Sequence, residues 1–235
     1  MHVMCRGSER ADLVTRDDSA LKSRSCLVIC YNYFMDLNQD FKYKTLPSFE
    51  KVKQIGKNIR VHPNGFIQLD LEDGYRLHFF LDDAAYERFP HTPIHTHAFV
   101  LESRVLLGEV TNIEFEVRED PQGSLSVYTA QNMESPLEKR VGKTYSISGK
   151  KEQVVGIGEE YRVRVGIFHE SLHKGDTVTV VRKIKEGMDV SMSCEIDVLC
   201  KKEQEPSEAY DRKDIPEAVL WSKVGAVLEN TTQKS

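Results

Sequence analysis

Two histidines one residue apart, His95 and His97, are the side chains in this sequence best placed to bind a metal ion. Because side chains alternate between the two faces of a strand, a His-x-His pair on a strand puts both imidazoles on one face. Glu102 follows five residues after His97 and can return from the next strand, and His169 lies about seventy residues further on. Three imidazoles and one carboxylate suit a divalent first-row transition metal and leave coordination positions for water, substrate or dioxygen. The sequence therefore predicts a metal site formed by His95, His97, Glu102 and His169.

A further histidine, His78, lies in the mainly apolar stretch 76–80. Alternation along a strand would direct its imidazole into the same interior, where it would bind substrate or act as a catalytic acid or base. The alternative is an ordinary hydrogen-bonded strand histidine. Of the remaining histidines, His173 is expected in a structural or rim position and His91 on a loop. His2 and His62 are expected on the surface.

Composition and charge limit the class of protein. The chain has 235 residues, of which 40% are hydrophobic, and this is enough to build one core. A formal net charge of -5, without a long basic block, gives no electrostatic footprint for nucleic acid or an anionic membrane. The five cysteines are odd in number and form no C-x-x-C pair, so they fit neither a disulfide framework nor a zinc ribbon. We expect reduced thiols.

The two ends differ from the middle of the chain. Residues 1–24 are polar and have no period that would bury a face, and we expect residues 1–40 to be disordered or misannotated. The apolar cluster 26–34 is either a docked edge strand or an artefact that precedes a true start at Met35. No apolar run is long enough to span a membrane, and the amino terminus lacks the order of a secretory signal. We therefore expect a soluble, cytoplasmic protein.

From about residue 41 to residue 200, short runs with strand character alternate with turn residues. These runs are 59–61, 66–71, 75–81, 95–100, 104–107, 110–117, 125–130, 143–147, 153–157, 161–168, 177–182 and 191–198. Many strands and little helix predict an all-β barrel of two facing antiparallel sheets. Short helices are expected outside the barrel at 47–55 and, within a charged tail at 201–235, at 215–228.

The spacing around the His-x-His pair resembles the first motif of the cupin superfamily, G-x5-H-x-H-x3-4-E-x6-G. In this chain the motif is matched by His95-x-His97-x4-Glu102-x5-Gly108. Phe89 stands where the motif begins with glycine, and one residue fewer precedes the final glycine. The resemblance implies that the two histidines and the glutamate share one metal ion.

The second cupin motif, G-x5-P-x-G-x2-H-x3-N, is matched in every spacing. It runs through Gly158, Arg164, Gly166, His169 and His173, with arginine in place of the proline and histidine in place of the asparagine. The resemblance implies a cupin-type double-stranded β-helix, or jelly-roll barrel, at 41–200 with short peripheral helices. It extends to small bacterial metal-binding cupins of unassigned activity.

The first functional hypothesis is a metal-dependent oxygenase or dioxygenase that uses Fe(II), although Mn(II), Ni(II), Cu(II) and Zn(II) suit the same ligands. A metal-dependent isomerase or decarboxylase is the second, and a non-catalytic small-molecule-binding cupin is the third. Glu102 weakens the resemblance to the thiol dioxygenases of the superfamily, because those enzymes use three histidines without the glutamate. We expect a small-molecule substrate and no nucleic-acid or membrane partner, with a homodimer left open.

Overall fold

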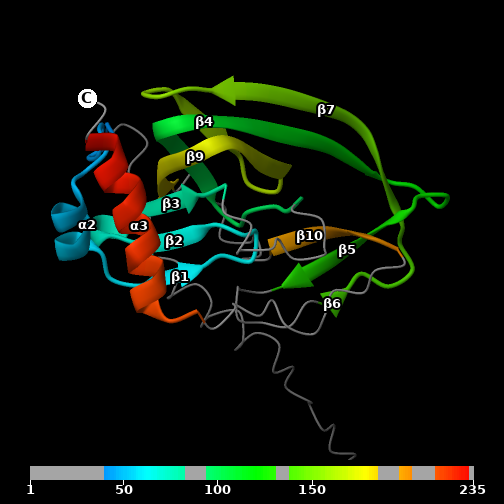
Figure 1. The fold of residues 1–235 in the computed structure, drawn as a ribbon. Coiled ribbons are helices and arrows are strands. Elements are labelled where there is room, and N and C mark those ends of the chain that lie inside the picture. Colours follow the sequence, from blue (N-terminus) through cyan, green and yellow to red (C-terminus); the bar gives the residue numbers. More distant parts are fainter. Residues whose placement is uncertain (1–39, 83–93, 131–137, 185–195, 203–214, 233–235) are drawn as a thin grey trace, which may run out of the picture. The chain divides into compact units, whose positions relative to one another are not determined.

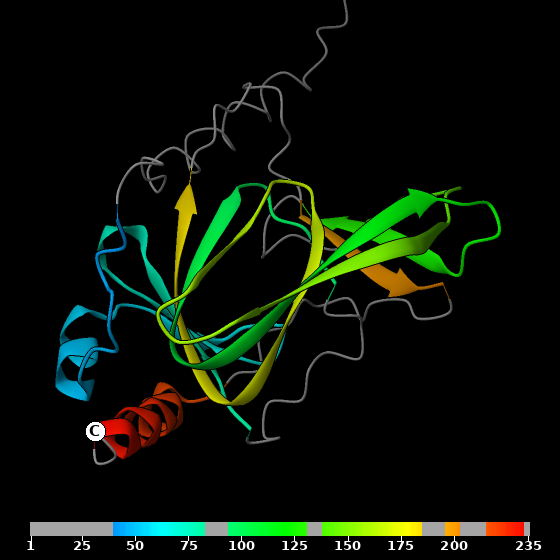
Figure 2. The same ribbon diagram turned by 90° about the horizontal axis from the view of Figure 1, so that it is seen from above.

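The computed structural model describes residues 40–82, 94–130, 138–184, 196–202 and 215–232. Ten strands form one sheet in the order β1-β2-β3-β9-β4-β7-β5-β10, with β6 beside β5, β8 beside β4, and every pair antiparallel. Their bounds are β1 Ile59–Val61, β2 Ile67–Asp70, β3 Arg76–Phe80, β4 Val100–Glu119, β5 Leu125–Ala130, β6 Glu138–Lys139, β7 Tyr145–Val155, β8 Glu160–Val163, β9 Phe168–Ile184 and β10 Ile196–Lys201. The sheet is curled (Figure 1, Figure 2). The predicted all-β class is confirmed.

The strands form one curled antiparallel sheet, which is consistent with the predicted jelly roll, and the long, continuous strands β4 and β9 link its parts. The predicted strands 104–107 and 110–117 are both parts of β4. The pairing of β4 with β9 shifts register around Leu107, where Gly108 has a φ of 75°. A Cβ on Gly108 would lie 2.3 Å from Oγ1 of Thr177, so only glycine permits this close approach. The glycine that looked like a turn marks a β-bulge instead.

Strand β7 also joins two runs that the sequence separated, 143–147 and 153–157. Its central residues are polar and most of its positions are exposed, so no burial pattern marked them as one strand. The register of β7 against β4 shifts between Glu116 and Val117, opposite Gly149. Hydrophobic alternation detects a strand only where one face is buried, and this strand buries little.

Two helices cover one face of the sheet beside β1 to β3 (Figure 1), and both were predicted. Helix α2, Phe49–Ile55, begins where the hydroxyl of Ser48 accepts a hydrogen bond from the N–H of Lys51 at 3.3 Å. Helix α3, Glu217–Thr232, packs against the same core. The core shared by helices and strands includes Val52, Ile55, Leu69, Leu77, Val180, Leu220 and Val224. A 3-10 turn, η1 Glu72–Gly74, joins β2 to β3.

The opposite face of these strands is called the inner face below. Leu77 and Val180 point toward the helices, so alternation directs His78 and Thr179 to the inner face. The register confirms the arrangement, because His78 lies opposite Gln68 of β2 on one side and Thr179 of β9 on the other. The inner face of this curled sheet carries the polar and aromatic residues from which a site can be built.

Candidate metal centre

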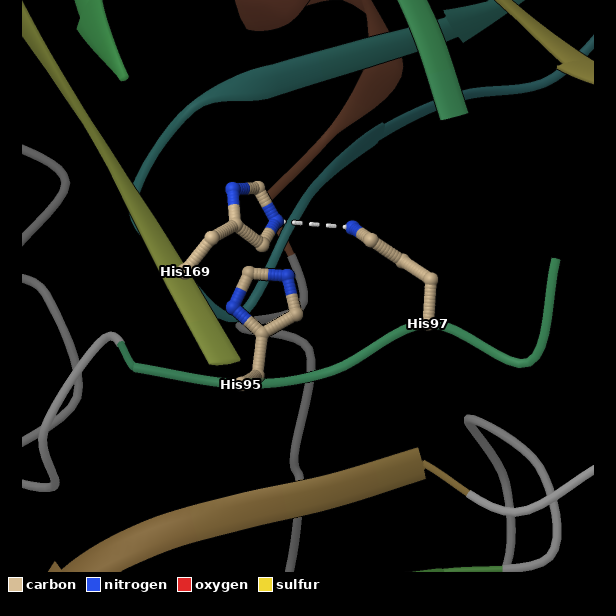
Figure 3. Close-up of side chains that lie close together, drawn as sticks. All are labelled: His95, His97 and His169. Atoms are coloured by element: carbon tan, nitrogen blue, oxygen red, sulfur yellow. Dashed lines mark hydrogen bonds between the residues drawn. The ribbon is translucent and has the colours of Figure 1, made fainter. Parts of the chain in front are cut away.

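His95 and His169 lie directly opposite each other in the backbone. The N–H of His95 donates to the carbonyl of His169 at 3.1 Å, and the N–H of His169 donates to the carbonyl of His95 at 2.9 Å. Residues that exchange both bonds project their side chains from the same face. His97 follows two residues after His95, and Figure 3 shows the three rings turned toward one another. The strand predicted from 95 begins only at Val100, yet isolated bridges keep His95 in the sheet.

The three imidazoles are close enough to share one ion. Ring centroids are 4.8 Å apart for His95 and His97, 4.7 Å for His95 and His169, and 4.9 Å for His97 and His169. The Nε2 atoms of His97 and His169 are 2.9 Å apart, and one nitrogen from each of the three lies within 4.8 Å of the others. Two nitrogens bound to one ion at about 2.1 Å are about 3.0–3.4 Å apart at octahedral or tetrahedral angles. Small side-chain rotations therefore suffice to complete the set.

The environment keeps the imidazoles of His97 and His169 neutral, which is the form that binds metal. Burial, followed by the neighbouring imidazole of His95, lowers the pKa of both His97 and His169 well below the ordinary 6.5. A protonated imidazole has no lone pair for a metal, whereas a neutral one offers a nitrogen donor. Three imidazole nitrogens on one face, those of His97 and His169 held neutral by burial, fit a divalent first-row transition metal.

Two asparagines hold the ring orientations. Oδ1 of Asn112, a residue only 2% exposed, is 3.0 Å from Nδ1 of His169. When Nδ1–H donates to this oxygen, the lone pair of Nε2 faces His97 and is available to a metal. The side-chain amide of Asn64 lies 3.4 Å from Nδ1 of His95. Neither asparagine was recognisable as a site residue from the sequence, since Asn64 stands in a Pro-Asn-Gly turn and Asn112 in an ordinary strand.

The structure does not bring Glu102 to the three histidines, and the expected fourth ligand is corrected. The side chains of Leu101 and Val105 belong to the inner cluster around Val181, whereas Glu102 has the opposite parity on β4. Its Oε2 accepts hydrogen bonds from Nε and Nη2 of Arg182 at 2.8 and 2.6 Å. Its Oε1 accepts one from Nε of Arg162 at 2.9 Å. Glu102 follows His97 by five residues. On a continuous strand an odd spacing puts two side chains on opposite faces.

His78 lies on the inner face, outside the group of three. Its ring centroid is 4.5 Å from that of Phe66 and 6.4 Å from that of His62. Among the described residues, no partner hydrogen-bonds its buried Nε2. Burial, with a smaller contribution from Arg76, lowers the pKa of His78 to about 3. Nδ1 of His62 accepts a hydrogen bond from the N–H of Asn64, and the side-chain amide of Asn64 lies 3.4 Å from Nδ1 of His95.

The structure also shows the surroundings of the other histidines and of one cysteine. His62 is partly buried and stacked on Phe66 at 4.2 Å with an interplanar angle of 7°, so it is not the surface residue that we expected. Nδ1–H of His173 donates to the carbonyl of Gly175 at 3.0 Å, in the structural role expected for it. Cys200 is a buried free thiol, and burial raises its pKa to about 11. His2, His91, Phe89 and the remaining cysteines lie outside the described residues.

Comparison with known proteins finds structural matches of low sequence identity and low TM-score. No protein-family model and no curated protein match the chain. Matching solved structures include the cupin domain of Drosophila melanogaster CENP-C, with 11% identity, 71% of this chain and 99% of that chain covered, and a TM-score of 0.30. Hydroquinone 1,2-dioxygenase in complex with Cd²⁺ and 4-hydroxybenzonitrile matches with 14% identity, 66% and 88% coverage, and a TM-score of 0.30. Oxalate oxidase in complex with glycolate matches with 18% identity, 85% and 83% coverage, and a TM-score of 0.22.

These TM-scores are too low to support a conclusion about this chain. The structure of the chain itself supports one, because a curled antiparallel sheet brings a His-x-His pair next to a third histidine on its inner face. The fold is cupin-like. Among the described residues, no helix is long and apolar enough to cross a membrane.

Proposed function

We propose that this chain is a metal-dependent oxygenase that holds Fe(II) through His95, His97 and His169 and acts on a small molecule. The supporting observation is the convergence of three imidazoles, with Nε2 of His97 and His169 only 2.9 Å apart. Asn112 fixes the tautomer of His169 that a metal needs. The metal, when bound, would supply a Lewis acid and a redox centre with open positions for substrate and dioxygen.

The engagement of Glu102 by two arginines bears on the class of oxygenase. Three histidines without a carboxylate leave three positions open on an octahedral ion. This donor set resembles that of the thiol dioxygenases within the cupin superfamily, which use three histidines. A glutamate ligand would have weakened this resemblance. Small thiols therefore come first in the panel of candidate substrates.

The residues around the three histidines are suited to positioning a substrate and limiting water. The ring of Phe99 lies 5.2 Å from that of His97, and Phe168 belongs to a neighbouring apolar cluster. We assign His78 the role of a group that binds substrate or transfers a proton, because its Nε2 is unpartnered among the described residues on the same face. A pKa near 3 keeps this imidazole neutral at neutral pH and makes it a weak base, so hydrogen bonding to a substrate is favoured over proton transfer.

Metal content is the first test. The chain is purified and reconstituted with Fe(II) without oxygen, and bound metal is counted by elemental analysis. We expect about one equivalent in the unmodified protein and a large loss in His97→Gln, which removes one of three donors. His173→Gln is the matched control and should retain the metal, because its Nδ1–H donates to the backbone carbonyl of Gly175 and it does not belong to the group of three histidines. If the unmodified protein binds less than about a tenth of an equivalent of metal after reconstitution, a non-catalytic binding protein is favoured.

Oxygen uptake by the loaded protein then tests the reaction class. Uptake that depends on an added small thiol, with stoichiometric oxidation of its sulfur, is the expected result. Turnover of any substrate without oxygen consumption would instead identify a metal-dependent isomerase or decarboxylase. We retain the predictions of a small-molecule substrate, a homodimer and a cytoplasmic location as parts of this proposal.

A further inference from the structure

A second concave site has none of the three histidines in its lining, and it includes Ser126 of β5 and Lys139 of β6. Figure 1 shows where β5, β6 and β10 lie in the sheet. It is a cavity of about 410 Å³, within the size range of small-molecule pockets. The side chains that give it its chemistry are Ser126, Lys139, Arg140, Lys143, Lys202 and Glu119. Four cations gathered in one cavity contrast with the net negative charge of the chain.

Only two of these four cations have a carboxylate partner among the described residues. Nη2 of Arg140 is 2.8 Å from Oδ1 of Asp197, and Nζ of Lys143 is 2.7 Å from Oε2 of Glu119. The ammonium of Lys139 instead lies 5.7 Å from the ring centroid of Tyr128. Lys139 and Lys202 therefore contribute about two uncompensated positive charges to the cavity.

Buried hydroxyl groups accompany this charge. Ser126, which lines the cavity, is 1% exposed, and no described residue hydrogen-bonds its Oγ. Tyr128, two residues further along β5 and on the same face, is 4% exposed, and its hydroxyl likewise has no partner in the described part of the chain. Buried polar atoms are normally satisfied, because leaving them unsatisfied destabilises the fold. A hydroxyl retained at such a cost, beside unpaired lysines, suits a ligand with oxygen acceptors.

We propose that this cavity binds the phosphate group of a small phosphorylated molecule. A phosphomonoester carries close to two negative charges at neutral pH, which matches the two unpaired lysines, whereas a carboxylate carries one. Lys139 and Lys202 neutralise the group, and the hydroxyl of Ser126 donates a hydrogen bond to one of its oxygens. This site uses none of the three histidines, so it stands or falls independently of the metal centre.

Calorimetric titration of the full-length, metal-free protein with inorganic phosphate, phenyl phosphate and benzoate tests the proposal. We expect saturable binding of one equivalent of either phosphate, weakening with salt, and much weaker binding of benzoate. Lys202→Ala should weaken phosphate binding about tenfold or more, because a charge-assisted contact is lost. Lys151→Ala, which removes an exposed lysine of β7 outside the cavity, is the matched control and should leave binding unchanged.

Ser126→Ala separates a ligand-binding role from a structural one. Among the described residues its Oγ has no hydrogen-bond partner, so the variant should unfold at the same or a higher denaturant concentration while it binds phosphate several-fold more weakly. Non-saturable binding, benzoate binding as tight as phenyl phosphate, or equal losses in Lys202→Ala and Lys151→Ala would overturn the proposal. Unchanged phosphate affinity in Ser126→Ala, or a loss of its stability, would also overturn it.

Discussion

Glu102→Gln removes one negative charge from a buried ion pair and leaves the three histidines untouched. The carboxylate of Glu102 and the guanidinium of Arg182 are both almost fully buried, with side chains 10% and 4% exposed. Removing one partner of a buried pair costs about 3–5 kcal/mol, because the other charge remains buried without compensation. Glutamine keeps one acceptor oxygen, so we expect the free energy of unfolding to fall by about 3 kcal/mol.

Urea unfolding, followed by circular dichroism, measures that loss, and metal content at a temperature where the variant is folded is measured on the same sample. We expect a large loss of stability with full metal retention. Arg162→Gln is the matched control, because Arg162 is 42% exposed and should cost only about 1 kcal/mol. A Glu102→Gln protein that keeps its stability and loses its metal would refute the assignment, because the carboxylate would then be a ligand.

Three further predictions concern the support of the site and the curl of the sheet. Asn112→Leu should lower metal affinity about 10–100-fold in chelator competition, because His169 loses the partner that fixes its tautomer; unchanged affinity would refute this role. The pKa of His78 is lowered to about 3, so the unfolded state binds the extra proton first and stability is lost as pH falls below 6.5 toward 3. Between pH 7 and 5 the free energy of unfolding, measured with denaturant, should fall by about 2 kcal/mol more in the unmodified protein than in His78→Phe. Equal decreases in the two proteins would contradict the lowered pKa. Gly108→Ala should lower the melting temperature markedly, because its Cβ would meet Oγ1 of Thr177 at 2.3 Å, and an unchanged melting temperature would contradict the bulge.

Much of the fold could be predicted because burial alternates along the chain. Leu77 and Phe79 face the helices while His78 does not, and this pattern is visible in the sequence. Strand ends were less predictable. Gly108 looked like a turn although it sits in a bulge, because a glycine with positive φ occurs in both. The polar centre of β7 is exposed, so it carried no period that could reveal one continuous strand.

The candidate site was predictable where alternation or spacing governs it. His95 and His97 share a face through alternation, and the spacing of the second motif pointed to His169. Glu102 was misplaced although the chain does bend at residues 98 and 99, because the register of β4 directs its side chain toward Arg162 and Arg182 and away from the histidines. Asn112 was missed, because a single asparagine on a strand becomes meaningful only when the register shows which imidazole it reaches.

The most direct test of the central claim is the coordination of Fe(II) in the reconstituted protein, measured by X-ray absorption together with metal counting. We predict about one ion per chain with three imidazole nitrogens at about 2.0–2.2 Å. The imidazole scattering should weaken in any His97→Gln protein that still binds iron, and it should be unchanged in Glu102→Gln. A chain that binds no iron, or iron bound without imidazole scattering, would contradict the account.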